Sequence, residues 1–401
     1  MDQATTRAER LTLGDPLRGL AALAVVVFHV TISAAFIGAG SAAIFGEEVF
    51  GAAHTTLFSL SAAVHVFFVL SGYLLMRPFA RWLVGGAQRP QLVRYGLHRL
   101  MRIGPAFWLA VLATAVLVGS KGAPDREFLD LALLVHGWDS QSEIGQAMPQ
   151  AWTLDIEALF YLLLPIGALL AAGLLGAARG QLVRAGVLLA GIAALCLGTL
   201  AWSSAANTVA ESQVPPKFLF AFTPGMALAV LEPLLAPRAR GAAWARHAQL
   251  PLLVGSLLAF VLLVRTDAAS FGTRDALATL SSAALMSAVV LRQWHGTRAW
   301  RTLDQPVLHA LGRWSYGVYL AHTIVLDVTE PVFRDVGGVW PTLLVGCAVV
   351  IPLSVLVAAA SWRFVERPAL ALADHLAARW RTRRAGAADR AETVAASAGV
   401  P

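Results

Sequence analysis

The chain has 401 residues, of which 57% are hydrophobic and 14% are charged, and its mean hydropathy is +0.66. This balance excludes an ordinary soluble globular domain and indicates a protein that lies within a lipid bilayer. The formal net charge of +7 indicates membrane orientation and contact with anionic lipid, and no nucleic acid is expected as a partner.

Ten hydrophobic runs, several of them near membrane-spanning length, follow one another along the chain. Because lipid offers no partners to exposed backbone groups, each run is predicted to be a helix. The fold class is therefore all-α and integral to the membrane, with about ten transmembrane helices. The runs are residues 17–36, 56–76, 104–119, 152–176, 181–203, 216–234, 249–265, 275–291, 312–333 and 339–361.

The distribution of basic residues predicts how these helices are oriented. If the N-terminus is cytoplasmic, all but six of the 31 Lys and Arg residues fall on the cytoplasmic side, which is a strong positive-inside bias. An even number of helices then returns the C-terminus to the cytoplasm, and the protein is expected in the inner or plasma membrane. The six basic residues on the opposite side are Lys121, Arg126, Lys217, Arg265, Arg274 and Arg334.

One membrane domain is predicted over residues 1–368, with no room for an appended soluble enzyme. Residues 369–401 are predicted to be cytoplasmic. The Arg-, Leu- and Trp-bearing stretch between Arg363 and Arg384 is typical of a helix that lies in the membrane interface. The small and polar residues after about Arg384 are expected to be disordered.

The sequence carries no motif for a metal or a tightly bound cofactor. None of HExxH, CxxC, the phosphate-binding loop or GxGxxG occurs in it. The cysteines, Cys196 and Cys347, lie in separate apolar runs and indicate no disulfide framework. No metal site is therefore expected.

An arginine and a histidine lie inside the first hydrophobic run. Eleven residues separate Arg18 from His29, so the two share one helix face about 16 Å apart. With Arg18 at one interface, His29 lies near the middle of the bilayer, where an ionisable group indicates function. The alternative is a histidine satisfied by a neighbouring helix, with Arg18 extended toward the interface.

Two further histidines are expected at a depth similar to that of His29. They are His65 in the second run and His322 in the ninth. Glu157 in the fourth run is expected above them, toward the outer surface, where a carboxylate must be paired or protonated. Asp155 lies nearer the water and is expected to be solvated. Together the three histidines and Glu157 predict a polar cavity within the bundle.

Arg99 and Arg102 enter the third run just before Pro105. Their spacing places both on one helix face. Two guanidinium groups at the mouth of a membrane protein suit phosphate groups, because they offer several charge-assisted donors in fixed geometry. A phosphate-bearing ligand is therefore expected at the cytoplasmic mouth.

These motifs together resemble those of the acyltransferase 3 family of polytopic membrane acyltransferases. The resemblance runs from Arg18 to Pro368, and the motifs follow the order of the family. They are Arg18-x10-His29, Phe67-Phe68-Val69-Leu70-Ser71-Gly72, Arg99-x-x-Arg102-x-x-Pro105, Trp152-x-Leu154-x-x-Glu157-x-x-Phe160-Tyr161, Leu311-Gly312-x-x-Ser315-Tyr316 through Tyr319-Leu320-x-His322, and Glu366-x-Pro368. The chain departs from the usual residues at His65, Thr153 and Ala321, which concerns substrate contacts more than the reaction class.

The resemblance implies an acyltransferase that transfers groups other than aminoacyl groups. It implies transfer of an acyl group, commonly acetyl, from acyl-CoA as co-substrate to a hydroxyl of a sugar, a cell-envelope glycan or a glycosylated small molecule. Attack by a hydroxyl needs a general base poised near neutrality, which suits histidine. His29 is predicted to be that base, with a transient acyl-histidine as the alternative.

The resemblance also suggests roles for the other residues. Arg18 is expected to contact the CoA side or to orient His29, and Glu157 to orient a histidine or to receive the acceptor. Glu366 is expected to anchor the tail by pairing with a basic residue. The predicted donor-binding residues are Arg99, Arg102 and Ser71, although Ser71-Gly72 also permits close helix approach. The supporting residues are His65, Tyr316, Tyr319 and His322.

A transporter or proton-coupled carrier is the alternative function. Intramembrane His and Glu residues are what a proton relay would use. Against it, the sequence shows no inverted repeat and no pair of Gly- or Pro-broken helices in matching places of two halves. The basic cytoplasmic mouth also favours a CoA ligand.

Overall fold

The structure is a computed structural model that describes residues 11–40, 49–119, 127–138, 147–178, 180–206, 211, 214–266, 271–297 and 300–397. Over these ranges every regular element is a helix, and the described chain has no strand. The predicted all-α fold is therefore confirmed. Two residues of the predicted outer side, Lys121 and Arg126, lie outside the described residues.

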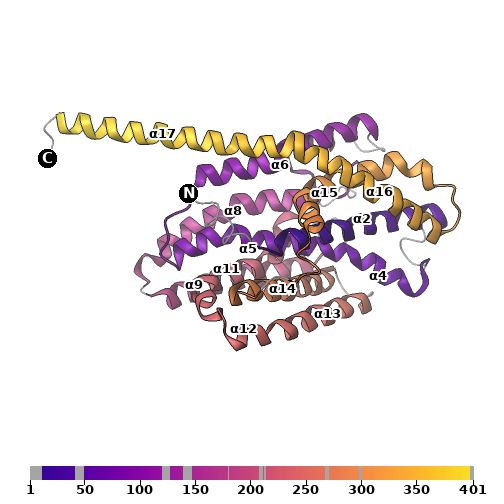
Figure 1. Ribbon diagram of the computed structural model, residues 1–401, viewed down its shortest axis with the longest axis horizontal. Helices are drawn as coiled ribbons and strands as arrows, with labels where there is room; N and C mark the ends of the chain where they lie inside the picture. The colour runs from indigo at the N-terminus through magenta and orange to yellow at the C-terminus, as the bar shows by residue number, and fades with distance from the viewer. Residues whose placement is uncertain are drawn as a thin grey trace.

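Most of the long helices run along the long axis of the molecule and form one bundle (Figure 1). They are α2 (Gly14–Ala39), α5 (Val64–Leu83), α6 (Leu92–Leu117), α8 (Trp152–Leu174), α9 (Gln181–Ser204), α11 (Thr223–Ala239), α13 (Gln249–Arg265), α14 (Phe271–His295), α15 (Pro306–Phe333), α16 (Val339–Ser361) and α17 (Arg367–Ser397). The short segments are η1 (Gly51–Ala53), α4 (His54–Phe58), η2 (Ser59–Ala63), α7 (Glu127–Ala132), η3 (His136–Trp138), η4 (Leu175–Ala177), η5 (Pro215–Phe222), α12 (Ala243–His247) and η6 (Trp362–Glu366).

The predicted membrane spans all fall on these helices. Nine helical segments of the described chain are long and apolar enough to cross a membrane, and they contain or overlap nine of the ten predicted runs. The tenth run, 312–333, lies in α15, whose 28 residues are about 42 Å long and so also suffice to span a bilayer. Its polar residues lower its hydropathy, and those in its middle, from Ser315 to Thr323, are buried because α15 packs between α2 and α16.

Small residues allow the central helices to approach one another closely. A Cβ atom added to Gly312 on α15 would collide with the backbone of Asp15 on α2. On the other side of the bundle, a Cβ atom at Gly72 on α5 would collide with the carbonyl of Phe222, at the start of α11. Gly72 therefore has the close-approach role that the sequence offered for Ser71-Gly72.

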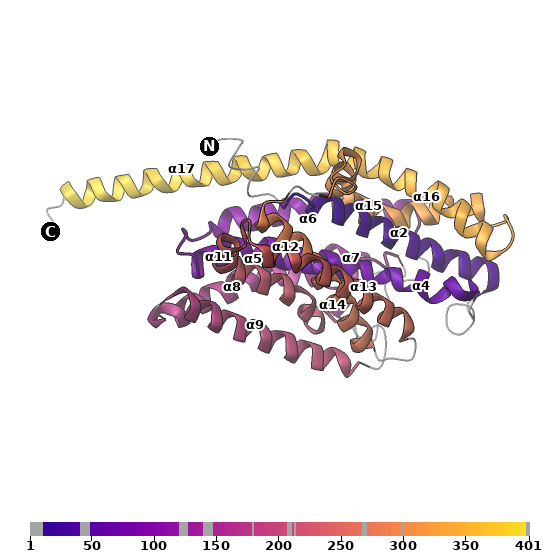
Figure 2. The same ribbon diagram turned by 60° about the horizontal axis from the view of Figure 1, so that its bottom comes forward.

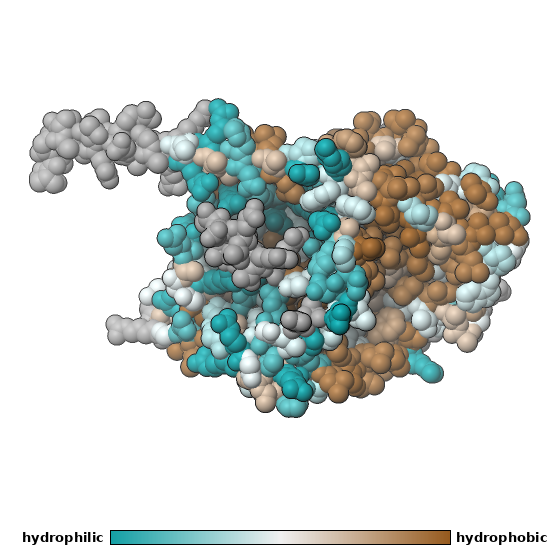
Figure 3. All heavy atoms as spheres, viewed as in Figure 1, coloured by the Kyte–Doolittle hydropathy of each residue, from teal (hydrophilic) through white to brown (hydrophobic). Residues whose placement is uncertain are grey.

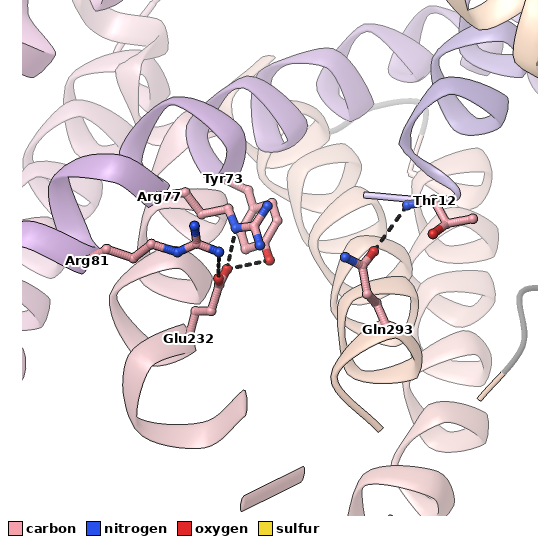
Figure 4. A network of polar contacts seen from close by, with 6 residues as sticks. All are labelled: Thr12, Tyr73, Arg77, Arg81, Glu232 and Gln293. Atoms are coloured by element: carbon pink, nitrogen blue, oxygen red, sulfur yellow. Dashed lines mark hydrogen bonds and ion pairs between the residues drawn. The ribbon is translucent and has the colours of Figure 1, made fainter. Parts of the chain in front are cut away.

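The basic end of the bundle, where α5 finishes and α6 begins, is the end that the charge distribution predicts to be cytoplasmic. Glu232 on α11 is buried there, and its carboxylate accepts a hydrogen bond from the Tyr73 hydroxyl at 2.7 Å. Arg77 and Arg81, further along α5, donate to the same carboxylate at 2.6 and 2.9 Å (Figure 4). This network ties α5 to α11, so these two arginines have a structural role besides orientation.

The last two long helices are joined by η6, one turn of π-helix, so the chain is helical without a loop from α16 into α17. α17 runs along the bundle and projects beyond its basic end (Figures 1 and 2). The location of this stretch in the membrane interface stays a prediction. α17 is helical as far as Ser397, in keeping with its many helix-favouring alanines. Residues 398–401 lie outside the described residues.

The surface of the bundle shows where lipid contacts the protein. Figure 3 shows hydrophobic residues gathered over the part of the molecule away from the projecting end of α17, with hydrophilic residues nearer that end. On α6 and α16, large apolar side chains such as Val116, Leu344 and Leu356 are exposed. On a soluble protein so much exposed apolar surface would mark an interaction site, and on this protein it is the surface that lipid covers.

Candidate active site

Two of the three predicted histidines meet in the interior of the bundle. The ring centroids of His29 on α2 and His322 on α15 are 4.8 Å apart, and His322 Nε2 lies 3.2 Å from His29 Nδ1. His322 is fully buried, whereas His29 is half-buried. The close packing of α2 against α15 brings the two rings together.

The backbone around these two histidines fixes which nitrogen carries the hydrogen. His322 Nδ1 lies 2.7 Å from the carbonyl oxygen of Tyr319, and a carbonyl only accepts, so Nδ1 is the donor and Nε2 keeps its lone pair. His29 Nδ1 lies 3.0 Å from the carbonyl of Val25 and also faces the lone pair of His322 Nε2, so it too carries hydrogen. The remaining nitrogen, His29 Nε2, is left with a free lone pair.

A second polar group, here called the arginine cluster, lies toward the basic end. It consists of Arg18, Arg99, Arg102, Glu157, Tyr161 and Glu366. At its centre Glu157 on α8 accepts hydrogen bonds from Ser71 at 2.9 Å and from Tyr161 at 3.0 Å, one on each carboxylate oxygen. Ser71, predicted to bind the acyl donor, instead donates a hydrogen bond to Glu157.

The arginines of this cluster differ in how far they are paired. Arg18 interacts electrostatically with Glu157 and Tyr161 and is close enough to Arg102 to be repelled by it. Arg99 lies over the ring of Tyr161, with its guanidinium carbon 5.6 Å from the centroid. Arg99 Nε is buried and has no hydrogen-bond partner within the described part of the chain.

Arg102, by contrast, is held by an ion pair. Its Nη1 donates to Glu366 at 2.9 Å, and the side chains are 15% and 0% exposed. The guanidinium also lies over the rings of Tyr316 and Trp362. The prediction that Glu366 pairs with a basic residue is confirmed. The charge of Arg102, predicted to meet phosphate, is balanced within the protein.

The supporting tyrosines connect α15 to its neighbours. The Tyr316 hydroxyl donates to the carbonyl of Ile103 on α6 at 2.9 Å. The Tyr319 hydroxyl donates to the carbonyl of Gln150 at 2.9 Å and lies 2.7 Å from the hydroxyl of Thr153 on α8. Both phenols therefore position α15, and Tyr319 does so beside the histidine pair, 5.8 Å between centroids from His322.

Glu157 does not lie above the histidines toward the outer side, as the sequence predicted. Tyr95, near the start of α6 at the basic end, donates to the carbonyl of Tyr161 at 3.2 Å. Arg18, near the start of α2, interacts with Glu157 itself. The prediction counted depth from Trp152 as if it stood at the surface. Instead, the residues just before α8 are buried under α7, so this helix begins inside the protein.

Asp155, also near the start of α8, was predicted to be solvated, and this prediction is wrong for the same reason. This side chain is 2% exposed and not solvated. One carboxylate oxygen lies 2.9 Å from Nδ1 of His136 and accepts a hydrogen bond from the backbone N–H of Gly137 at 2.6 Å. Asp155 therefore fastens η3 to α8. This pair has no local signal in the sequence because nineteen residues separate its members.

His65 does not join the other two histidines. It faces α14, and its Nε2 lies 3.7 Å from a carboxylate oxygen of Asp275. The face of α5 that carries Phe67 and Ser71 is the one that meets Tyr319 and Glu157. Only two of the three histidines predicted to share a cavity therefore meet. Two side chains at equal depth on two helices can still point in different directions.

An apolar cavity lies on another face of α15. It has a volume of about 360 Å³, and Gly317, Ala321 and Ile324 line it together with residues of α6 and α16. The histidine pair does not line it. Among the residues that the structure describes, no group of three or more His, Cys, Asp or Glu side chains is arranged to hold a metal ion.

Comparison with known proteins bears on this site directly. A family model described as an acyltransferase domain matches residues 15–359, which include the histidine pair and all of the arginine cluster except Glu366. The chain belongs to this acyltransferase family. The family match favours an enzyme over the carrier that the intramembrane His and Glu residues also suggested.

One relative of this acyltransferase is the exopolysaccharide production protein ExoZ of Rhizobium meliloti (strain 1021). The two are 32% identical over 112 residues, which are 25% of this chain and 32% of the relative. The chain thus aligns with about a third of that relative's length. No solved structure matches the chain.

Proposed function

We propose that this acyltransferase moves an acyl group, with acetyl as the first candidate, from acyl-CoA to a hydroxyl of a sugar or a cell-envelope glycan. The observation that carries the proposal is the free lone pair of His29 Nε2 on a half-buried ring inside the membrane bundle. A nitrogen with no hydrogen of its own can accept the proton of a substrate hydroxyl.

In the proposed reaction, His29 Nε2 takes the hydroxyl proton while the hydroxyl oxygen attacks the thioester carbonyl carbon. The carbon–sulfur bond then breaks, and the CoA thiolate receives the proton from His29. The products are the O-acylated acceptor and free CoA. The positive charge that forms on His29 is stabilised through Nδ1 by the Val25 carbonyl and by the lone pair of His322. In the alternative, Nε2 attacks the thioester first and carries the acyl group as acyl-histidine.

The arginine cluster is the proposed place for the phosphates of CoA. Its three guanidiniums outnumber its two carboxylates, and Arg99 retains a buried donor without a partner. Arg18 lies about 16 Å from His29 along α2, so a donor anchored here must extend toward the histidine pair. The pantetheine arm of CoA is an extended chain that ends in the thioester, as this arrangement requires.

The acceptor is proposed to enter from the opposite end of the bundle. CoA is too highly charged to cross a bilayer, and the basic end is the one predicted to be cytoplasmic. ExoZ is named for production of an exopolysaccharide, which supports a glycan acceptor. Sealed vesicles test the direction: acylation of an acceptor confined to the same side as CoA, with none supplied opposite, would show that transfer does not cross the membrane.

The donor is tested by thermal unfolding of the detergent-purified protein with CoA and with acyl-CoAs of increasing length. A ligand at about 100 times its dissociation constant adds about 2.7 kcal/mol to native stability. We expect one acyl length to stabilise the protein most, and less so in the Arg99→Ala variant. If no acyl-CoA stabilises well-folded protein, the donor is not a CoA thioester.

A further inference from the structure

A row of aromatic rings connects the end of the bundle opposite the basic end with the histidine pair. Successive ring centroids from Trp340 to Phe50, His54, Phe58, Phe28 and His29 are 5.2, 6.4, 4.5, 6.4 and 5.0 Å apart. We call these residues the aromatic row. Its members come from α2, α4, α16 and the residue before η1, so the fold assembles the row from separate parts of the chain.

The row leads inward from the surface. Trp340 at its outer end is 44% exposed, whereas Phe50 beside it is buried. His54, Phe58 and Phe28 are half-buried. α4 lies against α2 near the end of the bundle away from the projecting α17 (Figures 1 and 2). The row therefore runs from the end predicted to be outside toward the proposed base.

One polar group in this row has no role in the fold described so far. His54 stacks on Phe58 with an interplanar angle of 24°, and its Nδ1 is buried without a hydrogen-bond partner within the described residues. The next residue after Phe58, Ser59, also has a buried hydroxyl with no partner there. An unpaired buried polar atom is costly, and a bound ligand can satisfy it.

These features fit one class of ligand. A sugar ring has an apolar face of C–H groups and a rim of hydroxyls, so it needs flat aromatic surface together with a few hydrogen-bonding groups. The aromatic row supplies both, and it ends beside the nitrogen that would deprotonate a hydroxyl. Lipid chains need no polar partner and would leave His54 Nδ1 unsatisfied.

We propose that His54 and Phe58 form a carbohydrate-binding subsite through which the acceptor reaches His29. The proposal rests on the proposed function for the direction of the reaction, and on the ring geometry for the subsite itself. His54 hydrogen-bonds a sugar hydroxyl, and Phe58 together with Phe28 contacts the apolar face of the ring. The reacting hydroxyl then points to His29 Nε2.

The test measures access and occupancy without knowledge of the natural acceptor. In a background without the native cysteines (Cys196→Ala and Cys347→Ala), single Ala53→Cys and Leu57→Cys variants, which keep His54 and Phe58 in place, are treated with a membrane-impermeant maleimide added outside intact cells. Both positions are half-buried, as His54 and Phe58 are. Phe36→Cys, at the same end of α2 and 56% exposed, is the positive control. Phe68→Cys, 1% exposed on α5, is the negative control.

The maleimide labelling is then repeated in the presence of neutral oligosaccharides of glucose, galactose and N-acetylglucosamine. We expect external labelling at positions 53 and 57, and at least one oligosaccharide at ten times its dissociation constant should slow this labelling about tenfold, with no change at position 36. The proposal is wrong if only position 36 reacts, or if no oligosaccharide protects positions 53 and 57. The acyl-CoA thermal shift of the same proteins reports separately on the proposed function.

Discussion

The histidine pair and the arginine cluster lie about 16 Å apart along α2, yet they hold their polar groups in opposite ways. The two histidines are held by hydrogen bonds to backbone carbonyls and to each other, and no carboxylate of the described residues hydrogen-bonds either ring. The arginine cluster is held by charges, with Glu157 and Glu366 among three guanidiniums. A neutral pair keeps a lone pair available for a proton, whereas a charged cluster suits an anionic ligand.

This difference separates chemistry from binding along a single helix. α2 supplies Arg18 to the cluster near its start and His29 to the pair near its middle. Arg18 therefore does not orient His29, which was one of its two predicted roles; Val25 and His322 do so. Variants at the two regions should consequently change different kinetic parameters.

Replacing the proposed base should have the largest effect. We expect His29→Ala to lower kcat for acetyl transfer about 10³-fold, because general base catalysis typically contributes about 10²–10⁴-fold. The thermal shift caused by acetyl-CoA should persist, since the arginine cluster is intact. If the variant keeps a tenth of the wild-type kcat, another group is the general base and the assignment of His29 is wrong.

Breaking the buried ion pair should chiefly reduce stability. Glu366→Gln leaves the charge of Arg102 uncompensated, and such a change at a buried pair costs about 3 kcal/mol. The matched control is Asp374→Asn on α17, which removes an exposed pairing with Arg94 and His98 on α6 and should cost less than about 1 kcal/mol. Denaturant unfolding in detergent measures both. If the two variants lose the same free energy of unfolding, the buried Arg102–Glu366 ion pair does not stabilise the protein more than the exposed one does.

The next effect concerns the partner of the base. His322→Phe keeps a ring in place but removes the lone pair that faces His29 Nδ1. We expect kcat to fall about 30-fold, as the loss of one hydrogen-bond partner worth about 2 kcal/mol implies. His322→Gln, whose side-chain oxygen can accept, should recover part of the rate. Identical rates for both variants would argue that His322 only fills space.

The smallest effect is expected on the donor side. Arg99→Ala should raise KM for acetyl-CoA about tenfold, the loss of about 1.4 kcal/mol of binding, and leave kcat nearly unchanged. The effect should disappear with acetyl-pantetheine, which lacks the nucleotide phosphates. Arg94→Ala, on the same helix but exposed and paired with Asp374, is the control. If Arg99→Ala raises KM equally for acetyl-CoA and for acetyl-pantetheine, Arg99 does not bind the nucleotide phosphates.

The sequence predicted the helices well because hydropathy and length are local properties. Nine runs are long and apolar enough to span a membrane, and the tenth, in α15, is less apolar because it carries charged and polar residues such as Arg313, Tyr319 and His322. The family motifs likewise selected His29, Arg99 and Glu157 without any contact information. Some pairings were also within reach, since Tyr161 lies one helical turn from Glu157 at a spacing that permits their hydrogen bond.

The sequence was less informative where helix ends are not at the membrane surface. Glu157 and Asp155 were assigned depths by counting from Trp152, and both assignments fail because α7 and η3 cover the start of α8. The covering of the start of α8 has no local signal in the chain.

Hydropathy and motif order alone indicate a helical membrane protein of an acyltransferase family and the residues that carry the family motifs. The packing of the helices places His29 against His322 and not against His65, and pairs Arg102 with Glu366. The physical reason is that lipid is as apolar as a leucine side chain, so hydropathy does not show which face of a membrane helix turns toward a neighbour. That choice depends on close contacts between residues far apart in the chain, such as Gly312 against Asp15.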